Sequence, residues 1–239
     1  MKYANIYTTS ESTSYDQGLK EYMYLIYKNM GLSLLISALV AFFVSRSGTL
    51  LSLLFSNWLM ATIVSFAPIF FIFSINKSIY TGSIADAKKK LFIFSSLMGL
   101  SLSTVFVFYN YGDIFSVFLT TSATFGVMSL YGYVTKKDLT SWGSFLFMGV
   151  MGLFIASLIN MFVRSASANL TIAYISVILF VLYTAYDVQN LKKLYTFVGI
   201  NSDFKERIAI MGALSLYIDF INLFLSLLRI MSHSRNNRN

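Results

Sequence analysis

Residues 208–231 read IAIMGALSLYIDFINLFLSLLRIM, and this stretch decides the class of protein to which the chain belongs. It is almost wholly apolar and has the length of about 20 residues that an α-helix needs to cross a bilayer. One acidic residue, Asp219, lies near its middle, and Ser215, Asn222 and Ser226 fall on the same helical face. An ionisable residue at that depth is costly, so it is expected to face a cavity or a partner and to serve a function.

The composition of the whole chain extends this interpretation. Of its 239 residues, 56% are hydrophobic and 12% are charged, whereas soluble domains carry about 25% charged residues. Six further apolar stretches precede the one quoted above. The seven stretches cover residues 30–44, 50–75, 91–109, 114–133, 142–163, 170–191 and 208–231. We therefore predict an all-α, polytopic membrane protein with seven transmembrane helices.

The predicted spans divide the chain into three parts. These are an N-terminal cytoplasmic tail (residues 1–27), a seven-helix transmembrane domain (28–231) and a C-terminal tail (232–239). The first tail is polar and mixed in charge, unlike a secretory signal, so it is expected to be retained and partly flexible. Pro68, the only proline, predicts a kink or a break in the second span. Asp138 is predicted to cap the helix of the fifth span.

Several kinds of chemistry are excluded by residue type. The chain has no cysteine and one histidine, His233, which lies in the C-terminal tail. Disulfides, thiolate metal sites and a cysteine nucleophile are therefore impossible. A histidine-based catalytic or zinc site has too few residues to be built. We accordingly expect that the protein is not an enzyme and carries no resident cofactor.

The excess of positive charge is explained by membrane orientation. With the N-terminus in the cytoplasm, the cytoplasmic segments hold 13 of the 18 Lys and Arg residues and the outer segments hold 5. Such a bias favours a cytoplasmic N-terminus and an outer C-terminus. The net charge of +8 therefore does not require nucleic acid as a partner, and the expected partner is the lipid bilayer.

A second acidic residue, Asp187, lies inside a predicted span. On its helix Ser176, Tyr183 and Asn190 share the same face. Two polar stripes on consecutive antiparallel helices are expected to face each other, which would bring Asp187 toward Asp219. By residue counting the two carboxylates lie roughly 6 and 16 Å from the inner membrane edge. They therefore meet only if the seventh helix begins outside the bilayer or is displaced along its axis.

An inert role for Asp187 is the alternative, because Lys192 and Lys193 follow it closely and could pair with it at the membrane surface. If instead the two carboxylates meet, they cannot both ionise without cost and titrate as a unit. Oxygen-only ligands suit a hard cation such as Ca²⁺. Asp187 and Asp219 are thus predicted to form a pH-sensing pair and a transient Ca²⁺ site. Four neighbours of the pair on the same stripes are predicted to support it: Tyr183, Asn190, Ser215 and Asn222.

Three segments of the second half resemble the signatures of the Bax-inhibitor family of membrane proteins. They are FGVMSLYGY (residues 125–133) with Lys136-Lys137-Asp138-Leu139 after it, YTAYDVQ (183–189) and ALSLYIDFINLF (213–224). Their order and spacing are similar to those of the family, and the layout is most similar to its bacterial branch. The resemblance implies a bundle in the bacterial cytoplasmic (inner) membrane, with two three-helix layers around a central C-terminal helix.

The same resemblance implies a pH-sensitive calcium leak gated by an aspartate pair, which falls here on Asp187 and Asp219. Ca²⁺ and protons are then the transported and sensed ions. Family members of known structure are similar in carrying a second-span arginine that latches the closed pair. This chain has no Arg or Lys in residues 50–75, so it departs from the family at the latch.

Two other functions remain as alternatives. The bacterial branch includes members that bind and restrain an FtsH-type membrane AAA protease through a flexible N-terminal tail, and residues 1–27 are compatible with that role. An intramembrane aspartyl protease would also carry one aspartate on each of two neighbouring helices. It would need a Gly-x-Gly-Asp motif and a Pro-Ala-Leu segment. Here Asp219 follows Leu216-Tyr217-Ile218 and the only proline is Pro68, which disfavours the protease.

Overall fold

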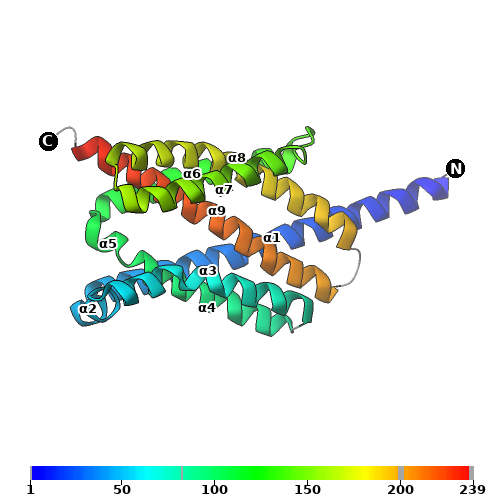
Figure 1. Cartoon of the computed structure of the whole chain (residues 1–239). Helices are drawn as coiled ribbons and strands as arrows, with labels where there is room; N and C mark the ends of the chain where they lie inside the picture. Colours follow the sequence, from blue (N-terminus) through cyan, green and yellow to red (C-terminus); the bar gives the residue numbers. More distant parts are fainter. Residues whose placement is uncertain (1, 82, 199–201, 237–239) are drawn as a thin grey trace.

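The computed structural model describes residues 2–81, 83–198 and 202–236, and all regular structure within them is helical (Figure 1). The helices are α1 (Lys2–Arg46), α2 (Gly48–Phe55), α3 (Trp58–Thr81), α4 (Ile84–Leu102), α5 (Val105–Phe108), α6 (Tyr111–Val134), α7 (Trp142–Val163), α8 (Ala166–Val198) and α9 (Ser202–Asn236). In the described part of the chain, six helices are long and apolar enough to cross a membrane, and the bent pair α2–α3 makes a seventh if it counts as one span. The prediction of an all-α polytopic membrane protein is confirmed.

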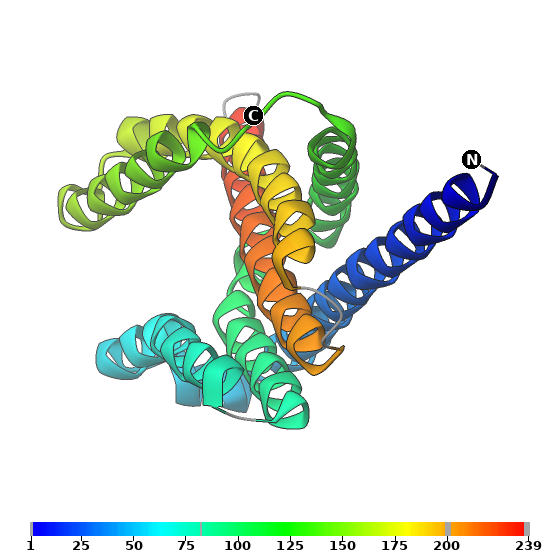
Figure 2. The ribbon, with the colours of Figure 1, turned by 90° about the vertical axis from the view of Figure 1, so that its right-hand side faces the viewer.

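Helix α9 forms the centre of the bundle. It packs against α1, α3, α4, α6 and α8, with α1 to α4 on one side of it and α6 to α8 on the other (Figures 1 and 2). Of its most apolar stretch 72% is buried, against 6% for α7 at the periphery. The layered arrangement around a central C-terminal helix, which the resemblance implied, is therefore present.

Small residues allow the helices to cross closely at two places. At Gly132 on α6, an added Cβ would lie 2.3 Å from the carbonyl oxygen of Ala185 on α8. At Gly99 on α4, it would lie 2.7 Å from the carbonyl oxygen of Ser37 on α1. The hydrophobic effect does not drive helices together in lipid, so close van der Waals contact at such crossings helps to stabilise the bundle.

The N-terminal segment differs from the predicted tail. Helix α1 continues without a break through the predicted boundary at residues 27 and 28. Leu19, Tyr22, Met23 and Ile26 are all buried in the core. They recur at helical spacing, and the charged residues between them lower the average hydropathy enough to hide this apolar face. The packed bundle therefore begins at about residue 19.

The second span is broken at a different residue from the one predicted. The chain turns by 92° between α2 and α3, and Asn57 caps the new helix by accepting a hydrogen bond from the N–H of Leu59 (3.0 Å). Pro68 lies inside α3, which runs through it. A proline leaves the carbonyl four residues earlier without its helical donor. Here that carbonyl, on Val64, accepts a hydrogen bond from Ser101 Oγ of α4 (2.7 Å), so the helix continues.

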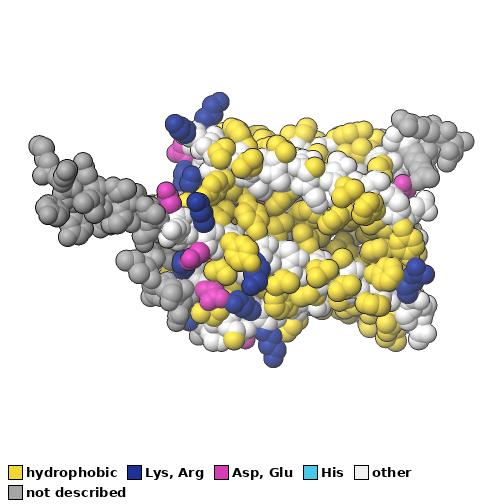
Figure 3. Space-filling view, turned by 180° about the vertical axis from the view of Figure 1, so that it is seen from behind, with side chains coloured by type: hydrophobic (Ala, Val, Ile, Leu, Met, Phe, Trp, Pro, Cys, Tyr) yellow, Lys and Arg dark blue, Asp and Glu magenta, His cyan; other side chains and the backbone are white. Residues whose placement is uncertain are grey.

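The charged side chains gather at the two ends of the bundle and leave an apolar band between them (Figure 3). One end carries most of the positive charge on the displayed face. The last turns of α3, α6 and α8 lie at the end of the bundle from which α1 begins, and the last turn of α9 lies at the opposite end (Figure 1). A chain whose two ends lie on opposite sides of the membrane crosses it an odd number of times. The arrangement therefore agrees with seven spans, in which the bent pair α2–α3 counts as one.

Candidate functional site

The two intramembrane aspartates lie on neighbouring antiparallel helices, Asp187 on α8 and Asp219 on α9. Ser215 Oγ donates a hydrogen bond of 2.5 Å to Asp187 Oδ2, which fixes the register of the two helices. One turn further, the same antiparallel register places Tyr183 level with Asp219. Asp187 and Asp219 are both buried where α8 and α9 pack together. The structure thus places Asp187, Ser215, Tyr183 and Asp219 along one stretch of the contact between α8 and α9.

The two carboxylates have different surroundings. Asp187 is 8% exposed and lines a cavity of about 150 Å³ together with Asn190, Leu194 and Ser215. Asp219 is 4% exposed, does not line this cavity, and its Oδ2 atom has no hydrogen-bond partner. A buried oxygen without a partner is costly. Asp219 is therefore the acidic group that would gain most from a proton or a cation.

The axial offset expected from residue counting is partly present. Helix α9 begins at Ser202, six residues before the predicted span, so it does start outside the apolar stretch. Asp187 is nevertheless level with Ser215, one helical turn before Asp219. The pair is consequently staggered by roughly 6 Å along the helix axis, and Ser215 and Tyr183 occupy the positions across from the two acids.

The remaining predicted neighbours divide into two groups. Asn190 lines the cavity beside Asp187. Asn222 instead donates to the Ile218 carbonyl of its own helix (2.9 Å). Its amide is therefore engaged locally, and the helix rather than the aspartate pair determines its position.

The two lysines that could have paired with Asp187 contact a different part of the chain. Lys192 donates to the carbonyl of Tyr133 (2.9 Å) and lies 4.9 Å from the centre of the Tyr133 ring. Lys193 forms an ion pair with Asp138 and donates to Thr140 Oγ1 (2.7 Å). Both lysines therefore bind the end of α6 and the connection to α7, which leaves Asp187 to Ser215.

Gln189 completes this attachment of the α6–α7 connection. Its Oε1 accepts from the Leu139 N–H (2.8 Å), and its Nε2 donates to the Lys137 carbonyl (2.7 Å). Gln189 lies two residues from Asp187, so the connection is fastened directly beside the acidic site. This role of Gln189 was not predicted from the sequence. Its two main-chain partners lie 50 and 52 residues earlier in the chain, so no pattern near Gln189 indicates them.

Asp138 does not cap α7 as predicted, because Ser141 occupies the N-cap position of that helix. The Asp138 carboxylate accepts hydrogen bonds from the Thr140 N–H (3.0 Å) and the Thr140 hydroxyl (2.7 Å). The hydrogen bond from Lys193, together with these two, holds the pKa of Asp138 well below its usual range. The residue therefore stabilises the connection rather than the helix end.

A second polar cluster joins three helices and was not identified from the sequence. Ser37 Oγ on α1 lies 2.8 Å from the Ser95 carbonyl of α4 and 2.9 Å from the Ser33 carbonyl. Because its single proton goes to these acceptors, the Tyr217 hydroxyl of α9, 2.6 Å away, is the donor to Ser37. The available signal was the recurrence of Asn29, Ser33 and Ser37 at four-residue intervals, which is also typical of ordinary helix packing.

The site offers few ligands for a resident metal. Among the described residues, no three His, Cys, Asp or Glu side chains gather in one place, whereas Ca²⁺ takes about six to eight oxygen ligands. Two carboxylates with a serine, a tyrosine and an asparagine nearby fit a proton or a cation in passage better than a tightly held ion.

Comparison with known proteins extends these observations. A family model described as "Inhibitor of apoptosis-promoting Bax1" matches residues 19–237, a range that begins where the buried face of α1 begins. The inner membrane protein YbhL of Escherichia coli K12 is 39% identical over 219 residues, which cover 91% of this chain and 94% of YbhL. An uncharacterized protein of Borreliella burgdorferi is 40% identical over 87% of this chain and 89% of its own. RP147 of Rickettsia prowazekii is 36% identical over 96% of both.

Proposed function

The chain belongs to the Bax inhibitor family of integral membrane proteins, and from this premise we propose that it is a pH-sensitive calcium leak channel of the inner membrane, gated by Asp187 and Asp219. The observation that carries the proposal is the placement of these two carboxylates. Both are buried on adjacent helices of the bundle interior, and Asp219 Oδ2 has no hydrogen-bond partner. A bilayer protein retains such costly groups where ions or protons pass.

Protonation is the proposed switch. When both acids are ionised, their mutual repulsion and the unpaired Asp219 oxygen favour a cation between α8 and α9. Protonation removes that charge and allows the helices to stay closed. Calcium flux should therefore rise as the pH rises, and fall as the pair takes up protons.

The route proposed for the ion begins at the basic end of the bundle. The cavity next to Asp187 is also lined by Leu194 and Ile208, which lie toward the α8–α9 connection. An ion entering there meets Asp187 first and Asp219 one turn deeper. If the cytoplasmic face is the basic one, this cavity is the cytoplasmic entrance.

Ser215 is the proposed restraint on the closed pair. The arginine latch expected from the resemblance has no counterpart in residues 50–75. The hydrogen bond from Ser215 to Asp187 instead links the two helices directly. Unlike an arginine, the Ser215 side chain carries no charge. The hydrogen bond can therefore break without moving a charged group within the membrane.

The test is calcium flux into liposomes as a function of pH. Wild-type protein should show flux that rises with pH, whereas Asp219→Asn should show flux that no longer depends on pH. Asp16→Asn is the matched control, since it removes one carboxylate from the exposed part of α1. Equal pH-dependent flux from wild type and Asp219→Asn would refute the channel proposal.

Regulation of an FtsH-type membrane protease is the second candidate function. It is supported by the shape of α1, whose first turns extend beyond the bundle (Figures 1 and 2) and precede the family match at residue 19. The structure improves the test, because the buried face of α1 begins at Leu19 and a deletion of residues 2–14 stops short of it. Co-purification with the purified protease should be lost on that deletion. Retention that is unchanged by the deletion would contradict a tail-dependent interaction.

A further inference from the structure

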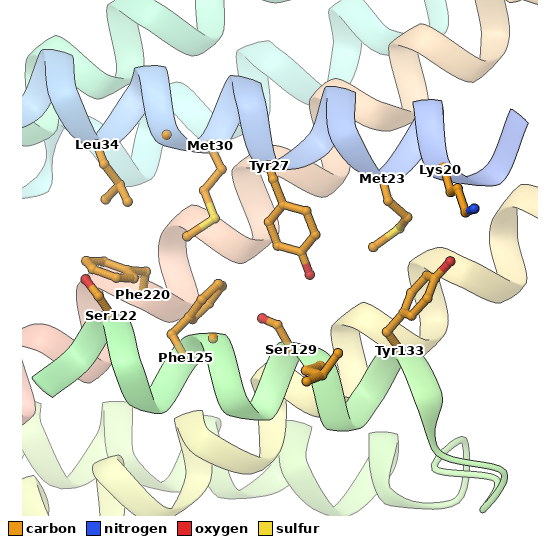
Figure 4. Close-up of a pocket in the computed structure, with 13 residues that line it drawn as sticks. Lys20, Met23, Tyr27, Met30, Leu34, Ser122, Phe125, Ser129, Tyr133 and Phe220 are labelled. Atoms are coloured by element: carbon orange, nitrogen blue, oxygen red, sulfur yellow. The ribbon is translucent and has the colours of Figure 1, made fainter. Parts of the chain in front are cut away.

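An apolar groove separates α1 from α6. Its volume is about 600 Å³, within the range of about 300–1,000 Å³ that is common for ligand sites. Helix α1 packs on α4 and α9, and α6 packs on α8 and α9. Met30 and Leu34 of α1 face Phe125 of α6 across the gap, and Phe220 of α9 forms the floor (Figure 4).

Two glycines deepen the groove, one on each wall. Gly31 of α1 and Gly126 of α6 both line it. A Cβ added at either position would meet no atom within 4 Å. These glycines therefore differ from Gly99 and Gly132, at which the backbone of a neighbouring helix lies too close for a side chain. Here the missing side chains leave open volume that something other than this chain can fill.

A hydrogen-bond donor without a partner points into this volume. Ser129 is 6% exposed and its Oγ atom has no hydrogen-bond partner. It points across the groove toward the Tyr27 hydroxyl (Figure 4). Four other hydroxyl side chains of α6 donate to the carbonyl four residues earlier: Ser116, Thr120, Thr121 and Ser122. Ser129 does not, and the Tyr27 hydroxyl interacts with it across the groove, so these two hydroxyls are the polar groups offered to a molecule in the groove.

The groove is amphipathic along its length. Lys20 and Tyr133 lie at one end (Figure 4), and Lys192 is held against Tyr133 at the same end. From Lys20 to Leu34 the α1 wall is roughly 21 Å long at 1.5 Å per residue. One leaflet of the hydrocarbon core is about 15 Å thick. The groove thus runs from a basic membrane surface through one leaflet.

We propose that this groove binds an acyl chain of an anionic phospholipid, with the phosphate at Lys20 and an ester carbonyl accepting a hydrogen bond from Ser129. The positive end fits the phosphate, and the apolar length fits the chain. A transmembrane helix of a partner fits less well. A helix about 10 Å across and 21 Å long fills roughly 1,600 Å³, well above the volume of the groove.

The proposal is tested by photocrosslinking in nanodiscs of phosphatidylethanolamine and phosphatidylglycerol, with a trace of phosphatidylglycerol that carries a diazirine in its acyl chain. Peptide mapping should find adducts on the groove faces of α1 and α6. Gly31→Leu combined with Gly126→Leu fills the open volume and should lower this labelling about tenfold, the effect of roughly 1.4 kcal/mol of lost binding. Gly152→Leu is the matched control, since Gly152 on α7 has equally empty surroundings.

Two single variants separate the parts of the proposal. Ser129→Ala keeps the groove intact, removes the donor and should also lower the labelling. Lys20→Gln should lower labelling by the phosphatidylglycerol probe about fivefold and leave labelling by a phosphatidylethanolamine probe unchanged. Labelling of the filled variant equal to that of wild type would overturn the proposal. A polypeptide recovered as the crosslinked occupant in cells would overturn it too.

Discussion

At the scale of single residues, the fold depends on polar side chains that satisfy main-chain groups inside the membrane. Ser101 shows this most clearly, because its hydroxyl occupies the position of the N–H that Pro68 lacks. In lipid no water can replace that donor. Gln189 satisfies two main-chain groups of the α6–α7 connection in the same way at the charged end of the bundle.

Removing the Ser101 hydroxyl should therefore destabilise the protein. Ser101→Ala leaves the half-buried Val64 carbonyl without a donor, which costs about 1–3 kcal/mol. The free energy of unfolding, measured by denaturant titration in micelles, should fall by that amount. In the Pro68→Ala background the helix regains its own N–H donor, so the same serine change should then cost much less. An equal loss in both backgrounds would rule out this explanation.

The acidity of Asp138 can be measured at the same scale. Its pKa is lowered mainly by Lys193 and secondarily by Thr140. A lowered folded-state pKa means that the contact contributes fully above the unfolded value of about 3.9 and is lost as the pH falls through the folded value. The carboxyl carbon resonance of Asp138 should titrate below the usual Asp range in wild type and closer to it in Lys193→Gln. Lys136→Gln, which changes a neighbouring exposed lysine, should leave the midpoint unchanged.

At the scale of helices, the positions where backbones cross are the most sensitive to added volume. Gly132→Ala would force a Cβ against the Ala185 backbone, and overpacking of this kind costs about 1–3 kcal/mol. Gly126→Ala on the same helix enters open space and should be close to neutral. Thermal unfolding in detergent should separate the two variants. Similar midpoints for both would contradict the assigned crossing.

The sequence predicts a helix correctly where the signal for it lies within the helix itself. The bounds of α6 and α7 were predicted to within about three residues, and the apolar centres of α8 and α9 were found, because each is a long apolar run between polar segments. Helices α8 and α9 extend about four to seven residues beyond the predicted spans at each end. The buried face of α1 from Leu19 to Ile26 was missed, since Lys20 and Glu21 interrupt it. The bend at Asn57 was assigned to Pro68 instead. That error arose because the compensating donor, Ser101, lies on another helix.

The candidate site was predictable in part for the same reason. Asp187, Asp219, Ser215 and Tyr183 stand out as polar residues in apolar helices. The structure joins Asp187 to Ser215 by a hydrogen bond, and their register places Tyr183 and Asp219 one turn further along the same contact. Asp187 pairs with Ser215 and not with Lys192 because Lys192 binds the Tyr133 carbonyl at the end of α6. The sequence of α8 alone does not show where α6 ends, so this partner could not be predicted from it.

At the scale of the whole molecule, the distribution of charge predicts the orientation. Because the chain has no native cysteine, single cysteines can be introduced at exposed positions and labelled with a membrane-impermeant maleimide. Thr49→Cys and Ser234→Cys should react in intact spheroplasts, whereas Lys136→Cys should react only after permeabilisation. The reverse pattern would place the N-terminus outside.

The central position of α9 also has a consequence for biosynthesis. The helix on which both layers pack leaves the ribosome after α1 to α8, so these helices must wait in the membrane without the surface that joins them. During that interval the sides of α1 and α8 that pack on α9 lack their partner helix. A chain that stops before α9 has nearly all of its spans and none of its centre, which should make it a ready substrate for membrane proteolysis.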